Sequence, residues 1–76
     1  MTAKTIIEHA KEELNVIYKP ACLSPKSRAE TWYAQAFEVI TFASSLLWSN
    51  GYYKESQEVK ELWENKWKAK FTKLLH

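Results

Sequence analysis

The sequence predicts an all-α fold, a three-helix bundle in which a long antiparallel hairpin of the second and third helices is covered by a shorter N-terminal helix. Two observations predict it. Apolar residues recur at helical spacing in three segments, and the 76 residues include one glycine and two prolines, too few for the turns of a sheet. This length allows a single helical domain, residues 1–76.

The first helix is expected over residues 5–18, where one face is apolar. Thr5, with a glutamate three positions later, forms a capping-box signature at its start. Pro20 and Pro25 are expected to end the helix and to make residues 19–26 a connector, because proline lacks the amide hydrogen that a helix needs.

The second helix is expected from Ser27 to Asn50. Ser27 and Glu30 again have capping-box spacing, and Gly51 suits the left-handed conformation that often follows a helix. The apolar arc of this helix covers about 240°, whereas a simple surface helix has an apolar stripe of ~100°. The segment 31–53 carries a single charged residue, so part of its apolar surface is expected to lack intramolecular cover.

The third helix is expected over residues 52–75, antiparallel to the second because the turn at Gly51 is short. A stripe at helical spacing predicts its buried face. The stripe consists of Ser56, Val59, Trp63, Trp67, Phe71 and Leu74.

The helix lengths predict an uncovered tip. At 1.5 Å per residue, a first helix of ~21 Å leaves ~14 Å of the ~35 Å hairpin uncovered near Gly51. An open apolar patch of this kind usually marks a binding or self-association surface. The residues expected around the gap are Phe42, Leu46, Trp48, Tyr52, Tyr53 and Val59.

This surface predicts a small non-enzymatic protein–protein interaction module, a regulator, inhibitor or adaptor that docks onto another protein or onto itself as a homodimer or larger homo-oligomer. Two histidines and no aspartate offer no triad-like arrangement, and one glycine cannot build a phosphate-binding loop. No cofactor is expected. His9 and Glu13 have the i, i+4 spacing of two metal ligands, but a solvated pair on a polar helix face is the simpler interpretation.

An alternative function follows from the basic C-terminal segment, where residues 65–76 contain four lysines and no acid. A lysine-rich helix with tryptophans is typical of weak nucleic-acid or anionic-surface binding. The residues predicted for such contacts are Trp63, Lys66, Trp67, Lys68, Lys70 and Lys73. Pairing of these lysines with the glutamates at positions 8, 12 and 13 of the first helix is the intramolecular interpretation.

A reduced, cytoplasmic setting is expected, because the lone Cys22 cannot form an internal disulfide and the start of the chain does not resemble a signal peptide. Cys22 is expected to pack as a small apolar residue, with an exposed reactive thiol as the alternative. The polar residues spread through the second helix, Glu38 among them, argue against integral membrane association.

Overall fold

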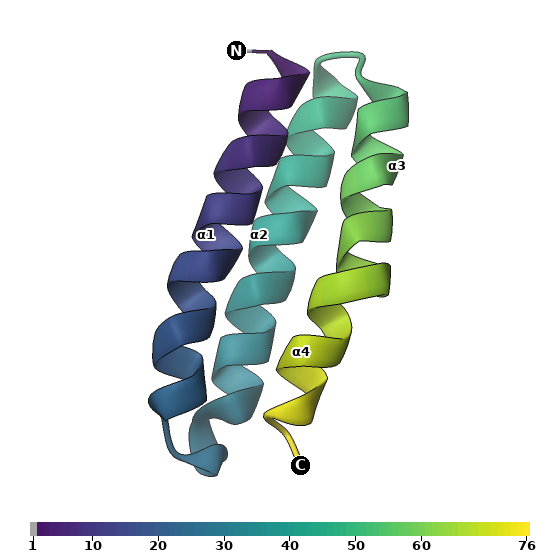
Figure 1. Ribbon diagram of the computed structural model, residues 1–76. Coiled ribbons are helices and arrows are strands. Elements are labelled where there is room, and N and C mark those ends of the chain that lie inside the picture. Colours follow the sequence, from purple (N-terminus) through teal and green to yellow (C-terminus); the bar gives the residue numbers. More distant parts are fainter. Residues whose placement is uncertain (1) are drawn as a thin grey trace.

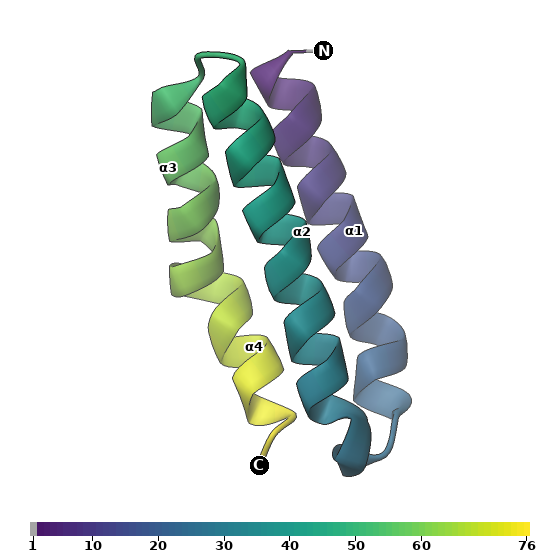
Figure 2. The ribbon, with the colours of Figure 1, turned by 180° about the vertical axis from the view of Figure 1, so that it is seen from behind.

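The computed structural model describes residues 2–76 and confirms the all-α three-helix bundle (Figure 1). The middle helix lies between the other two and runs antiparallel to both, as the view from behind also shows (Figure 2). The third helix is continuous but has a π-helical segment, η2, within it. The elements are α1 (Ala3–Leu23), a 3₁₀ turn η1 (Lys26–Arg28), α2 (Ala29–Ser49), α3 (Tyr53–Leu62), η2 (Trp63–Trp67) and α4 (Lys68–Lys73).

Helix α1 begins earlier than the sequence predicts. Thr2, not Thr5, is its N-cap, and the Thr2 hydroxyl oxygen accepts a hydrogen bond from the Thr5 amide at 3.2 Å. The predicted capping box at Thr5 is therefore wrong. A threonine placed one turn earlier satisfies the free amide at the helix start equally well, and the sequence pattern does not distinguish the two.

Helix α1 also continues through Pro20 to Leu23, so the predicted helix end before Pro20 is wrong. Proline removes one hydrogen bond from the helix interior. Packing of the last turn offsets this loss, because Ala21 is buried in the core. The turn is closed by Ser24, whose hydroxyl donates to the carbonyl oxygen of Pro20 at 2.7 Å and whose amide donates to that of Ala21 at 3.3 Å.

The extended α1 removes the predicted gap at the tip. Helices α1 and α2 each contain 21 residues, and the N-terminal end of α1 lies beside the turn that joins α2 to α3 (Figure 1). The expectation of a short first helix covering only the Ser27 end of the hairpin is therefore wrong. Any exposed apolar surface must come from the outer sides of the helices and not from a missing length of cover.

The start of α2 also differs from the prediction. Ser27 lies within the 3₁₀ turn η1, and within residues 2–76 no side chain caps the first turn of α2. The turn is held by the Arg28 amide, which donates to the carbonyl oxygen of Pro25 at 2.9 Å. The predicted end of α2 is confirmed: Asn50 caps it, and Gly51 has a φ of +83°, a conformation that glycine adopts at little cost.

The π-helical segment adjusts the register of the third helix. In the buried stripe, Val59, Trp63, Trp67 and Phe71 follow one another at intervals of four residues, which is longer than the 3.6-residue turn of an α-helix. Between Trp63 and Trp67 the helix takes up the surplus by a wider turn, in which the Lys68 amide donates to the Trp63 carbonyl oxygen five residues earlier. All four side chains thereby stay on the core side.

The buried side chains form one continuous core along the bundle. The half of the core that lies near the C-terminal end of α1 is aromatic. The Phe71 ring is fully buried there, and the centroid of this ring lies 5.4 Å from that of Tyr18 and 6.3 Å from that of Trp67. The Trp67 indole N–H is buried and has no hydrogen-bond acceptor among residues 2–76. Through its ring contacts with Trp67 and Phe71, Tyr18 joins α1 directly to the third helix.

Two buried serines fix how α2 and α3 lie against each other. The Ser56 hydroxyl donates to the Ser44 carbonyl oxygen at 2.9 Å, and the two hydroxyl oxygens are 2.8 Å apart, so Ser44 donates to Ser56. Both side chains are buried: Ser44 is 6% exposed and Ser56 is 2% exposed. Their mutual satisfaction allows polar groups in an otherwise apolar interface.

Ser56→Ala is expected to lower the free energy of unfolding by about 1–2 kcal/mol, because it leaves the buried Ser44 hydroxyl without its acceptor. Urea denaturation followed by circular dichroism measures the loss. The double variant Ser44→Ala/Ser56→Ala is expected to lose about 1 kcal/mol less than the sum of the single changes, because neither partner is then left unpaired. Strictly additive losses would show that the two hydroxyls are not coupled.

Candidate protein interface

The residues predicted to surround the tip differ in exposure. Phe42, Trp48 and Tyr53 are 72%, 60% and 57% exposed, whereas Leu46 and Tyr52 are half-buried. Val59 is only 1% exposed and belongs to the core, so its place among the interface residues is wrong. The reason is that Val59 belongs to the inward stripe of α3, which α1 and α2 cover.

These residues do not form one patch. Phe42 and Trp48 are six residues apart on α2, which at 3.6 residues per turn places them about 120° apart around the helix. Phe42 and Leu46 line a groove between α1 and α2. Trp48 lies on the α3 side, where its ring centroid is 4.4 Å from that of Tyr53. The expected single surface is therefore two grooves, one between α1 and α2 and one between α2 and α3, which share Phe37, Thr41 and Ser45 in their linings.

The groove between α1 and α2 has a volume of about 1220 Å³. Its walls are mainly apolar, and small side chains, Ala10 from α1 and Ala43 from α2, contribute to the lining. Phe42 also lines the groove, and most of its side chain is exposed to solvent. The remaining apolar lining consists of Ile6, Ile17, Phe37, Val39 and Leu46, and His9, Glu13, Gln35, Glu38, Thr41 and Ser45 supply polar groups.

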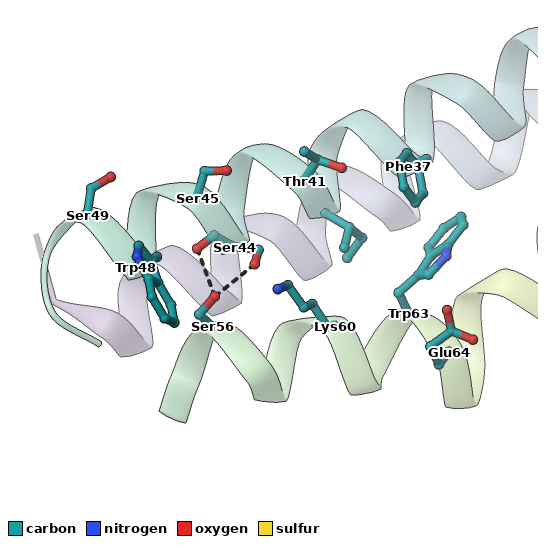
Figure 3. A pocket seen from close by; sticks show the side chains of 11 residues that line it. Phe37, Thr41, Ser44, Ser45, Trp48, Ser49, Ser56, Lys60, Trp63 and Glu64 are labelled. Carbon is teal, nitrogen blue, oxygen red and sulfur yellow. Dashed lines mark hydrogen bonds between the residues drawn. The ribbon is translucent and has the colours of Figure 1, made fainter. Parts of the chain in front are cut away.

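The groove between α2 and α3 is smaller, about 610 Å³, and more polar in character (Figure 3). The hydrogen-bonded pair Ser44 and Ser56 lies between the two helices. Lys60 extends from α3 into the space between them, and hydroxyls on α2 add further polar groups. Both grooves expose mainly apolar surface, and a partner entering either one would also have to satisfy the polar groups of its lining.

The predicted lysine–tryptophan surface is only partly present. Trp63 and Trp67 are 3% and 1% exposed, so their prediction as contacts for bases or headgroups is wrong. They are part of the stripe that packs against α1 and α2. The side-chain nitrogens of Lys66 and Lys70 lie 5.2 and 4.8 Å from the Trp67 ring centroid. The Lys68 Nζ atom forms an ion pair with the Glu64 Oε2 atom at 3.4 Å. The lysines therefore cover the outside of a buried aromatic cluster.

Pairing of these lysines with α1 glutamates is also not what the structure shows. In the part of the chain that the structure describes, the ion pairs are Lys68–Glu64 and the exposed His9–Glu13 pair at 3.6 Å. The α1 glutamates occupy the N-terminal half of α1, whereas Lys70 lies over Tyr18, in its C-terminal half, 5.3 Å from the ring centroid. The parallel course of α1 and α4 keeps the two groups of charges apart.

Cys22 is exposed, so the expectation that it packs as a core residue is wrong. It lies on the outer side of the last turn of α1, a turn that exists only because the helix continues past Pro20. Within residues 2–76 there is no group of three or more potential metal ligands. None of the helices described here combines the length and the apolar character needed to cross a membrane.

Sequence reasoning missed the α1 wall of the larger groove. The apolar face of the first helix was expected to pack against the hairpin, and Ala10 and His9 were not connected with Phe42. A helical wheel of α2 contains the signal, because it places Phe42 and Trp48 on different sides of the helix. The wheel alone does not show which helix lies on each side of α2.

Comparison of the chain with protein-family models, with curated protein sequences and with solved structures finds no match in any of the three. The function is therefore inferred from the surface of the bundle: a large apolar groove beside an exposed phenylalanine on one side of α2, and a smaller, more polar groove on the other.

Proposed function

We propose that the protein is a small non-enzymatic interaction module that forms a symmetric homodimer through the groove between α1 and α2. One observation carries the proposal. Phe42, with 72% of its surface in solvent, stands beside a hollow whose lining includes the small side chains of Ala10 and Ala43. A water-exposed aromatic ring next to an apolar hollow usually marks a surface that another molecule covers.

A second copy of the chain fits this surface because projection and hollow lie on the same face. In a two-fold arrangement, the patch on one subunit meets the same patch on the other, so each residue contact occurs twice. Each Phe42 would enter the hollow of the opposite subunit, and the alanines leave room for the ring. Burial of a phenylalanine removes ~150–250 Å² from water, which makes Phe42 the expected centre of the interface.

Phe42→Glu tests the proposal, because it places a charge at the centre of the proposed contact without entering the core. We expect the wild-type chain to approach twice the monomer mass in light scattering as its concentration rises. The variant should stay monomeric, with its dissociation constant raised at least a hundredfold, corresponding to about 3 kcal/mol. Circular dichroism should show unchanged helicity.

Trp48→Glu is the matched control, since it makes the same kind of change at an exposed aromatic on the other side of α2. It should dimerise like the wild type. A wild-type chain that remains monomeric at every concentration would overturn the proposal. So would dissociation caused by Trp48→Glu but not by Phe42→Glu, which would move the contact to the Trp48–Tyr53 pair.

A further inference from the structure

Charge is distributed unevenly along the bundle. The end that holds the connection between α1 and α2 and the C-terminal segment, residues 14–34 and 63–76, carries seven basic and two acidic residues, a balance of +5. The opposite end, residues 3–13 and 39–62, carries four basic and six acidic residues, a balance of −2. Glu38, between these two ends, adds one negative charge, so the modest net charge of +2 conceals one strongly basic end.

Three separate segments build this basic end. Lys19 belongs to the last turns of α1, Lys26 and Arg28 to η1, and four lysines to η2 and α4. Lys26 reaches across to the C-terminal segment, where its amine donates to the carbonyl oxygen of His76. Lys70 lies over the ring of Tyr18, the residue before Lys19. The fold thus creates this basic cluster, which includes more residues than the run of C-terminal lysines visible in the sequence.

The basic end also carries the most exposed large apolar side chain among those described. Leu23, the last residue of α1, is 89% exposed, and it lies four residues after Lys19 on the same face of the helix. The bundle measures 39 × 18 × 15 Å, so this is one of its narrow ends. The groove proposed for dimerisation runs along a long face, and both surfaces remain accessible together.

We propose that this basic end docks on an anionic lipid bilayer, with the lysines against the headgroups and Leu23 at the boundary of the acyl chains. Each lysine or arginine near an anionic membrane adds to binding, and an inserted apolar side chain supplies a second, independent contribution. Leu23 is what favours a bilayer over a nucleic acid, because a phosphate backbone would leave it in water. The buried Trp63 and Trp67 offer no stacking platform for bases.

The single cysteine, which is exposed, allows a direct test in the 76-residue chain. Cys22, next to Leu23, is labelled with an environment-sensitive fluorophore, and the protein is titrated with vesicles of phosphatidylcholine alone or mixed with phosphatidylserine. We expect at least tenfold stronger partition onto the anionic vesicles, a blue shift of the label, and loss of binding as salt rises.

Matched charge reversals identify the surface. Lys26→Glu/Lys66→Glu/Lys73→Glu changes exposed lysines at the basic end, and Lys4→Glu/Lys11→Glu/Lys54→Glu makes the same net change elsewhere. The first triple variant should lose at least tenfold in partition, and the second should bind markedly better than the first. Binding of unlabelled protein, measured by co-sedimentation, should fall about tenfold in Leu23→Ser.

Three results would overturn the proposal. The first is equal partition onto neutral and anionic vesicles, or none onto either. The second is an equal loss of binding in the two triple variants, which would indicate an effect of net charge alone. The third is salt-dependent binding to duplex DNA that is at least as strong as vesicle binding and unchanged by Leu23→Ser, which would make the basic end a nucleic-acid surface.

Discussion

Deletion of Thr41 is expected to abolish folding, whereas deletion of Asn65 is expected to leave the bundle folded. Both residues are exposed and both lie within long helices. They differ in the hydrogen bonding of the helix around them. Thr41 lies in regular α-helix, so its removal turns the following buried residues, Ala43 and Leu47, by about 100° relative to Ile40. That rotation places them outside the core.

Asn65 lies in the π-helical segment, where the helix already accommodates one residue more than a regular turn holds. Its deletion shortens the interval between Trp63 and Trp67 to three residues. The buried stripe then alternates between three and four residues, as in a regular amphipathic helix. We expect the free energy of unfolding to change by no more than about 1 kcal/mol, out of ~4–11 kcal/mol for a chain of this size.

Circular dichroism at 222 nm and urea denaturation distinguish the two deletions. The expected result is a cooperative transition for the Asn65 deletion and none for the Thr41 deletion. If both variants unfold, the wider turn between Trp63 and Trp67 is required for packing and does not merely take up a surplus residue. If both fold, the register of α2 is not fixed by its buried residues.

Phe71→Ala is expected to lower the free energy of unfolding by about 4 kcal/mol. Phe71 is fully buried, and its ring is the meeting point of Tyr18 from α1 with Trp63 and Trp67 from the third helix. Truncation leaves a cavity between large rigid rings, which cannot easily collapse into it. In a chain of this size the loss is a large part of the ~4–11 kcal/mol total, so the urea concentration at the unfolding midpoint should fall sharply.

Phe37→Ala is the control for Phe71→Ala, since it removes the same side chain from a half-exposed position. Phe37 is 48% exposed and has one edge contact with Trp63, at 5.9 Å between ring centroids. The expected loss is about 1 kcal/mol. Urea denaturation of both variants gives the comparison, and similar losses would mean that the aromatic cluster is not the centre of stability.

The three helices, their antiparallel order and the turn at Gly51 were predictable because each depends on local signals. Apolar spacing defines a helix face, and a glycine after Asn50 supplies the left-handed conformation. The continuation of α1 through Pro20 was not predictable, because tertiary packing of Ala21 outweighs a local preference. The error mattered, since the predicted gap at the tip depended on the length of α1.

The candidate interface was predictable in its residue types but not in its arrangement. The excess of apolar residues in α2 indicated exposed aromatics, and Phe42, Trp48 and Tyr53 are indeed exposed. Their separation into two grooves depends on which helix lies on each side of α2. The stripe correctly predicted the burial of Trp63 and Trp67, but the π-helical segment that keeps both on the core side was not predicted, although the four-residue intervals of the stripe are a signal for it.

The arrangement of α2 between its two sequence neighbours has a kinetic consequence. Its main helix–helix contacts are with the helix before it and the helix after it, and both connections are short. Chains dominated by contacts between neighbouring segments close small loops first and fold within microseconds to milliseconds. The slower step for this chain should therefore be any encounter with another molecule, so its apolar groove is complete well before a partner arrives.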